Sequence, residues 1–227
     1  MLTLQSLIKK KHKMVIDLKH YNGFIFDMDG VIADNHHYHI DAWREFCKRH
    51  GLSFEVGAFT SKYFGKNNTD ILQALLGKSL SDIEIDLLGE EKEAIYRELY
   101  QPYIKPLDGL IDFMRELRIQ GGKIAIASSA PQSNINFVVE KTCIKEYIDV
   151  SVNGNMVKFG KPNPDIFLKA AELLHIQPQK CLVFEDSFSG IQAAINAGMQ
   201  VVAVATTHKK EEHDPALTII SDFRELL

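Results

Sequence analysis

The 227-residue sequence contains few cysteines, and the three present, Cys47, Cys143 and Cys181, stand far apart. An odd number of cysteines without a Cys-x-x-Cys pair predicts neither a disulfide framework nor a structural zinc site. The chain also lacks an apolar run long enough to cross a bilayer, and its first residues reverse the order of a signal peptide. We therefore expect a protein of the reducing cytoplasm that does not enter a membrane.

The sequence has little excess charge of either sign, because 26 lysines and arginines face 30 aspartates and glutamates, for a net charge of −4. This balance creates no general field that would attract nucleic acid or an anionic membrane, so neither is expected as a partner. The basic cluster between Lys9 and Lys13 is short and isolated, which favours a solvated arm over a tether. An anionic substrate would have to be held by local chemistry.

What the sequence does contain is a series of short, continuous apolar runs of the kind found in doubly covered parallel strands. The runs cover residues 24–26, 124–127, 181–184 and 201–205. Amphipathic helical patterns lie between them at residues 110–117, 167–174 and 189–197. This alternation predicts an α/β fold, a Rossmann-like parallel sheet flanked by helices.

The alternation is interrupted after the first run, where residues 36–105 show helical patterns and no comparable strand. We interpret this stretch as an inserted all-helical unit, with residues 1–35 and 106–227 forming the α/β core. Ser81 and Glu84 have the spacing of a capping box and predict the start of one helix. Two other helices are expected to end at glycines, Gly51 and Gly77.

Two carboxylates, Asp27 and Asp29, directly follow the first apolar run, at the carboxyl edge of the predicted sheet, where ligands of such sheets bind. Carboxylates this close repel each other, so the pair implies either a bound divalent cation or a raised pKa on one member. Taken alone, the segment is also typical of a strand-to-turn junction, in which Asp caps and Gly30 bends the chain.

Polar residues also follow the later apolar runs or precede a predicted helix. Ser128 and Ser129 place hydroxyls where a helix N-terminus could hold phosphate, although each is also an ordinary capping residue. Lys161 precedes a helix between prolines that fix the backbone, although a lysine there is commonly a plain surface residue. Glu185 and Asp186 end a buried run, where an unpaired charge is costly and metal ligation would remove that cost.

Together, in this order, these motifs resemble those of the haloacid dehalogenase-like superfamily, in its β-phosphoglucomutase-like and phosphatase branch. The matching motifs are DMDGV at 27–31, Ser128, Lys161 within GKPNPDIF, and FEDS at 184–187. The similarity spans residues 23–206. It implies a Mg²⁺-dependent phosphatase that hydrolyses a small phosphorylated metabolite, such as a sugar phosphate, through an aspartyl-phosphate intermediate.

The resemblance also implies a role for each matching residue of the core. Asp27 would be the nucleophile, and Asp29 the general acid and base for the leaving group and the attacking water. Ser128, Ser129 and Lys161 would hold the transferred phosphoryl group. These assignments agree with the physical demands of phosphoryl transfer, which needs positioning and neutralisation of oxygen charge.

A magnesium site follows from the same resemblance. Asp186 would bind Mg²⁺ together with Asp27 and the backbone carbonyl of Asp29, and Glu185 would support the ion or its water. An all-oxygen shell of this kind suits Mg²⁺, which keeps several waters when it is bound.

The helical unit resembles the helical cap of that family, which closes over the site and selects the substrate. His39 and Trp43 match a stretch of the mutase branch that lies near the sugar and the cap hinge, although Trp43 also fits a helix core and His39 a capping or solvated position. Asn68 stands where that branch has a phosphate-gripping arginine, with Lys66 as a possible substitute. A lysine replaces a bidentate arginine poorly, so this departure favours a phosphatase over a mutase.

Other interpretations stay open at this point. The chain could be a β-phosphoglucomutase-like sugar phosphomutase, or a non-catalytic phospho-binding module that kept an acidic metal pocket. His36, His37 and His39 could form a transition-metal site, but neighbouring residues on a helix point to different faces. A monomer is expected, with oligomers left open.

Overall fold

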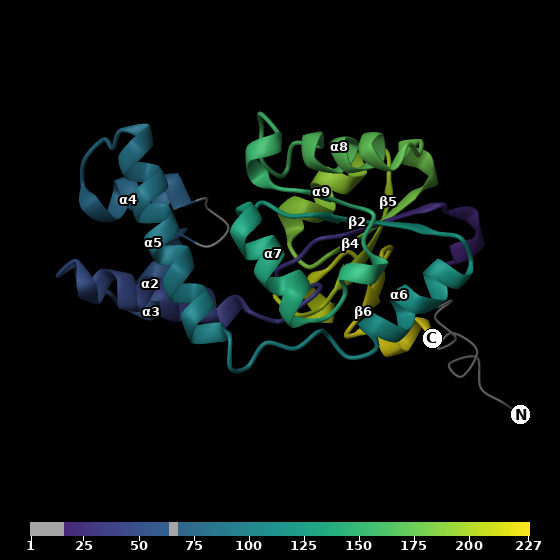
Figure 1. Ribbon diagram of the computed structural model, residues 1–227, viewed down its shortest axis with the longest axis horizontal. Coiled ribbons are helices and arrows are strands. Elements are labelled where there is room, and N and C mark those ends of the chain that lie inside the picture. The colour runs from purple at the N-terminus through teal and green to yellow at the C-terminus, as the bar shows by residue number, and fades with distance from the viewer. Residues whose placement is uncertain (1–15, 64–67) are drawn as a thin grey trace, which may run out of the picture.

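The computed structural model describes residues 16–63 and 68–227 (Figure 1). Its centre is a six-stranded sheet in the order β3-β2-β1-β4-β5-β6, in which all neighbouring strands run parallel. The strands are β1 Gly23–Phe26, β2 Lys123–Ala127, β3 Val150–Val152, β4 Cys181–Glu185, β5 Gln200–Val204 and β6 Thr218–Ile220. The predicted parallel α/β sheet is therefore confirmed. The two outer strands, β3 and β6, were not predicted, because three residues are too few to show a period.

Helices cover both faces of this sheet. The helices of the α/β part are α6 Leu110–Ile119, α7 Gln132–Lys141, α8 Asp165–Leu174 and α9 Phe188–Asn196. Phe24 and Phe26 of β1 pack in one core cluster with residues of α6 and α7, whereas Ile25 packs in another with residues of α8 and α9. Alternate strand residues point to opposite faces, and β1 is buried on both, which explains its unbroken apolar sequence.

In the described residues between β1 and α6, four helices lie beside the sheet in Figure 1. They are α2 His36–Arg49, α3 Val56–Tyr63, α4 Asn68–Leu76 and α5 Asp82–Tyr100. They share a hydrophobic cluster of their own, which includes Trp43, Phe46 and Tyr96. The helical character of this stretch agrees with the sequence analysis, although α3 was not predicted as a separate helix. The division of the chain into a cap domain at residues 36–105 and a core remains a proposal.

Local signals in the sequence explain several helix ends. The Ser81 side chain accepts a hydrogen bond from the Glu84 N–H, and the Glu84 carboxylate accepts one from the Ser81 N–H, so the predicted capping box is present. Gly51 and Gly77 have positive φ angles of 66° and 64°, as a left-handed helix end requires. Helix α8 has Pro164 at its N-cap position.

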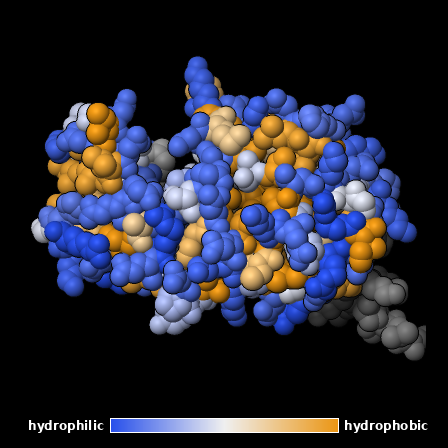
Figure 2. Space-filling model, viewed as in Figure 1, coloured by the Kyte–Doolittle hydropathy of each residue, from blue (hydrophilic) through white to orange (hydrophobic). Residues whose placement is uncertain are grey.

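The surface in the same view is mostly hydrophilic, with hydrophobic residues gathered in separate patches (Figure 2). Exposed apolar side chains on α5 include Ile83 and Leu87. Among the described residues, no helix is both long and apolar enough to cross a membrane.

Candidate active site

The ends of β1 and β4 bring three acidic residues together. The two strands are neighbours in register, with Phe26 opposite Phe184, so the residues that follow them lie side by side. Asp27, Glu185 and Asp186 each contribute a carboxylate oxygen, and these oxygens lie within 4.8 Å of one another. The strand order changes direction at β1, and the carboxyl edge at such a point is where α/β sheets bind ligands.

Lys161 joins this cluster from the loop that precedes α8. Its ammonium nitrogen lies 2.5 Å from Oδ1 of Asp27 and 2.5 Å from Oε1 of Glu185. The Phe167 ring lies beneath the ammonium, with its centroid 5.1 Å away. Burial alone would lower the pKa of Lys161, but the carboxylates of Asp27 and Glu185 outweigh it and raise that pKa. Lys161 is therefore positively charged.

The acids outnumber the cation in this buried cluster. Burial, together with the charges of Glu185 and Asp29, raises the pKa of Asp27 to about 7, although Lys161 acts in the opposite direction. Burial and the neighbouring carboxylates of Glu185 and Asp27 raise the pKa of Asp186 well above its usual value. Three buried carboxyl groups that share one lysine need a further cation if all are to be ionised.

The surroundings of the cluster fit a small cation with oxygen ligands. Gly30 has a positive φ of 79°, and a Cβ atom at this position would overlap the Asp186 carboxylate. A Cβ atom at Gly190 would likewise overlap the Glu185 carboxylate. Thr207 donates a hydrogen bond to Asp186 through its hydroxyl. The carboxylates are thus held tightly from several sides, and their oxygen-only donor set suits Mg²⁺.

Asp29 is held separately by residues at the start of the helical stretch. Its Oδ1 accepts a 2.5 Å hydrogen bond from the Asn35 side chain, and Nε2 of His39 lies 3.7 Å from the same oxygen. Burial opposes ionisation of Asp29, but His39 and Asn35 overcome this effect and lower its pKa. The Asn35 amide also donates a 2.6 Å hydrogen bond to the hydroxyl of Tyr96.

Asn35 and Tyr96 were not identified from the sequence. Asn35 directly precedes α2, where an asparagine is normally interpreted as a helix cap, yet its side chain makes no capping hydrogen bond. Its amide points to Asp29 and Tyr96. The position of Asn35, a polar residue between the DMDG motif and the first helix of the helical stretch, is the signal that could have identified it.

The two predicted phosphate-binding serines lie in the loop after β2. Ser128 is buried, with its N–H bonded to the Val152 carbonyl at 3.0 Å, and its hydroxyl accepts a 3.1 Å hydrogen bond from the Ala130 N–H. Ser129 is exposed. Helix α7 begins only at Gln132, so the serines precede the helix and do not cap it, contrary to the expected helix N-terminus at this point.

The predicted cap residues differ in their surroundings. Trp43 is 4% exposed and lies in the hydrophobic cluster of the helical stretch, as its alternative interpretation as a core residue predicts. His39 is not a helix cap, and its side chain is only partly exposed, since its ring stacks on Tyr96 at 3.9 Å and its Nδ1 lies 2.9 Å from the ammonium of Lys92. Asn68 donates a 2.7 Å hydrogen bond to Glu93, and Lys66 lies outside the described residues.

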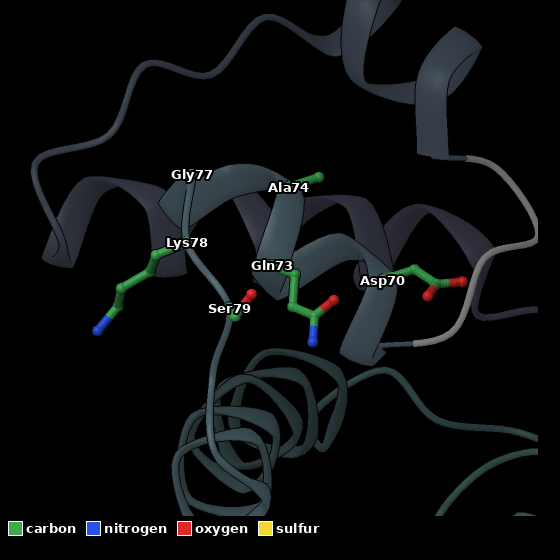
Figure 3. A pocket seen from close by; sticks show the side chains of 6 residues that line it. All are labelled: Asp70, Gln73, Ala74, Gly77, Lys78 and Ser79. Atoms are coloured by element: carbon green, nitrogen blue, oxygen red, sulfur yellow. The ribbon is translucent and has the colours of Figure 1, made fainter.

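Two other groups of residues are weaker candidates for an active site. Within residues 16–63 and 68–227, His36, His37 and His39 form no group of metal ligands with acids or cysteines. A separate hollow lies at α4 and the α4–α5 connection (Figure 3). It is lined by Asp70, Gln73, Ala74, Gly77, Lys78 and Ser79. None of the residues singled out from the sequence motifs of the core lies in this hollow.

Comparison with known proteins gives consistent results. Residues 24–204 match the family model described as haloacid dehalogenase-like hydrolase. The chain is 33% identical to fructose-1-phosphate phosphatase YqaB of Escherichia coli strain K12, over 81% of this chain and 96% of that protein. It is 34% identical to hexitol phosphatase A of the same organism, over 86% and 89%. A β-phosphoglucomutase structure from Clostridium difficile matches with a TM-score of 0.77 and 29% identity, over 91% and 93%.

Proposed function

Because the chain belongs to the haloacid dehalogenase-like hydrolase family, we propose that it is a Mg²⁺-dependent phosphatase that hydrolyses a small phosphorylated metabolite through an aspartyl-phosphate on Asp27. The observation that carries the proposal is the buried cluster in which Lys161 contacts Asp27 and Glu185, with Asp186 alongside. The relatives named for fructose 1-phosphate and hexitol phosphates favour a sugar phosphate as the substrate.

The first chemical step would form the covalent intermediate. An oxygen of Asp27 attacks phosphorus, and the bond between phosphorus and the substrate oxygen breaks. Asp29, in its protonated form, gives a proton to that departing oxygen. Lys161 sits 2.5 Å from Asp27, where its charge favours the ionised nucleophile and would neutralise a phosphoryl oxygen. Ser128 and Ser129 would donate hydrogen bonds to the other oxygens.

The second step would release phosphate. Asp29, now ionised, takes a proton from a water molecule, and the resulting hydroxide attacks the phosphorus of the aspartyl-phosphate. The Asp27 carboxylate leaves, and inorganic phosphate is formed. His39 and Asn35 lower the pKa of Asp29 against the effect of burial, which favours its ionised form once it has given up its proton and suits it to act as this base.

Asp27, Asp186 and the backbone carbonyl of Asp29 would hold Mg²⁺, with Glu185 as support. When bound, the ion would neutralise charge on the carboxylates and on the transferred phosphoryl oxygens. The excess of buried acid over lysine in this cluster supports the assignment.

The structural likeness to β-phosphoglucomutase keeps a sugar phosphomutase as the second candidate. The contact of Asn68 argues against it, because this residue stands where that branch would grip a second phosphate. Its amide donates to the Glu93 carboxylate, a group that repels phosphate. A non-catalytic phospho-binding module is less favoured, since Asp27, Asp29 and Lys161 supply a nucleophile, a proton carrier and a cation.

The decisive experiment incubates the purified full-length chain with Mg²⁺ and a panel of phosphorylated sugars and measures phosphate release. We expect release from at least one sugar monophosphate and none from the Asp27→Asn variant. Isomerisation of β-glucose 1-phosphate in the presence of a bisphosphate primer would favour the mutase. Absence of turnover for all substrates, with parent and variant alike, would overturn both enzymatic proposals.

The expected setting of this activity is the cytoplasm. Cys47, Cys143 and Cys181 are free thiols, as suits a reducing compartment. A monomer acting on a small metabolite, without nucleic acid or membrane, remains our expectation.

A further inference from the structure

Glu93 is a buried carboxylate to which the chemistry proposed above gives no role. It lies on α5 and is 4% exposed. Lys92 lies 3.0 Å from its Oε1, Asn68 donates a 2.7 Å hydrogen bond to the same oxygen, and Asn134 donates a 2.7 Å hydrogen bond to Oε2. Burial opposes its ionisation, but Lys92, the nearby His39 and the two amide donors outweigh burial and lower the pKa of Glu93 to about 2. Glu93 is therefore a charged acceptor in contact with three donors.

The donors come from different parts of the fold. Asn68 begins α4 and Lys92 is on α5, so both belong to the helical stretch. Asn134 belongs to α7, on the α/β side, and it is fully buried. Helix α7 lies between the helical stretch and the sheet in Figure 1, next to α5. The bond between Glu93 and Asn134 therefore joins the two parts of the molecule.

A second set of contacts strengthens this junction. The Asn134 side-chain oxygen accepts a 2.8 Å hydrogen bond from Arg97, one turn further along α5. Arg97 also donates a 3.2 Å hydrogen bond to Ser133 and pairs with Glu90. Helix α5 thus binds both polar atoms of the Asn134 side chain: Glu93 accepts from its nitrogen, and Arg97 donates to its oxygen. This pairing fixes the register and the orientation of α5 against α7.

The junction is connected to both sides of the active site. Helix α7 follows directly on the loop that carries Ser128 and Ser129. In the other direction, Lys92 lies 2.9 Å from Nδ1 of His39, whose Nε2 lies 3.7 Å from Asp29. A change in the position of α5 relative to α7 would therefore shift His39, which faces the proposed proton carrier, relative to the proposed phosphate loop.

We propose that Glu93 is a positioning residue that holds the helical stretch closed on the core through its contact with Asn134, and so aligns Asp29 with the phosphate loop. The inference rests on the proposed function for its catalytic consequence, but the contact itself can be tested without any substrate. Water can hydrate these groups when α5 and α7 separate, so the contact can be broken and remade during turnover.

The test exchanges donor and acceptor across the contact. Asn134→Asp places two carboxylates face to face, and we expect faster amide hydrogen exchange in α5 and α7 and a rise in KM of about tenfold, the size of one net hydrogen bond. Arg97 stays near the new carboxylate and limits the effect. The double variant Glu93→Gln with Asn134→Asp restores a donor opposite an acceptor. It should return exchange and KM to within about threefold of the parent.

Control variants separate the loss of the contact from the chemical change itself. Glu98 and Asn136 are exposed residues on the same two helices, so Glu98→Gln with Asn136→Asp makes the same chemical changes away from the contact and should alter neither readout. Asn134→Ala, which adds no charge, replaces Asn134→Asp if that variant does not fold, and should also accelerate exchange. Unchanged exchange in these single variants, or a folded double variant no closer to the parent than Asn134→Asp, would overturn the proposal. If the parent released no phosphate, the exchange data would still decide it.

Discussion

The molecule contains two buried charged clusters that differ in their balance of charge. At the sheet edge, three acids, Asp27, Glu185 and Asp186, lie together with one lysine, Lys161, which contacts the first two. In the helical stretch, Glu93 is paired with one lysine, and neutral amides complete its hydrogen bonds. The first cluster needs a further cation to be fully ionised, whereas the second is complete.

The pKa values record this difference. Burial and neighbouring acids raise the pKa of Asp27 to about 7, while Lys92, His39 and the amides overcome burial and lower the pKa of Glu93 to about 2. An incomplete cluster is poised to take a ligand, and a complete one holds elements in place. We therefore expect variants of the first cluster to affect ligand binding and catalysis, and variants of the second to affect stability.

The largest effect is expected at the nucleophile. Asp27→Asn keeps the size of the side chain but removes the negative oxygen that would attack phosphorus, so phosphate release should fall by about 1,000-fold or more. Steady-state phosphate release at saturating Mg²⁺ would measure it. Asp112→Asn, on the exposed surface of α6, is the matched control and should retain full activity. An Asp27→Asn variant with more than a tenth of the parent activity would exclude Asp27 as the nucleophile.

The next effect concerns metal and pH. Because the folded-state pKa values of Asp27 and Asp186 are raised, the folded protein without metal binds more protons than the unfolded chain between about pH 4 and pH 7. Its stability should therefore fall as the pH rises through that window. Mg²⁺ competes with these protons, so it should raise the Tm by several degrees at pH 8 and by less at pH 5.

Thermal melts with and without Mg²⁺ at the two pH values would check this prediction. Asp186→Asn should lose most of the Mg²⁺-dependent shift, because it removes one ligand and one buried charge. A shift of equal size at both pH values, unchanged in this variant, would contradict a metal held by the acidic cluster.

A smaller effect, with the opposite pH dependence, is expected for the complete cluster. Glu93→Gln removes a buried charge that Lys92 and two amides stabilise, so the variant should be less stable at pH 7 by about 1.5 to 3 kcal/mol. The pKa of Glu93 is lowered in the folded state, so its contribution is complete above the unfolded value near 4.3 and is lost as the pH falls toward 2.

Urea unfolding of the parent and Glu93→Gln at pH 7, 5 and 3 would follow this difference. We expect the gap between the two proteins to narrow at pH 3. A gap that widened on acidification would show that Glu93 is not stabilised as a charge.

The smallest effect is expected for Trp43. Its side chain is buried in the hydrophobic cluster of the helical stretch, so Trp43→Phe should lower stability by about 1 kcal/mol and leave KM for the substrate unchanged. Chemical denaturation and initial rates would measure the two quantities. A rise in KM without loss of stability would instead place Trp43 against the substrate.

Much of the sheet and its acidic edge could be predicted from sequence because both depend on local signals. Continuous apolar runs such as residues 24–26 indicate strands buried on both faces, and parallel strands all end at the same edge. Acids that directly follow two such strands are therefore placed at one edge, and they meet here because β1 and β4 are neighbours. The short strands β3 and β6 and the separate helix α3 escaped prediction, because too few residues carry their pattern.

By itself, the sequence determined the order of strands and helices along the chain and the chemistry at the strand ends, since periodicity and residue type act over a few neighbouring positions. The tertiary structure alone decided which of the acids in the Glu90–Glu93 segment would be buried. Glu93 meets Asn134, 41 residues away, only because α5 packs on α7. Helical periodicity defines the faces of α5, but the partner that covers a face depends on how distant helices dock.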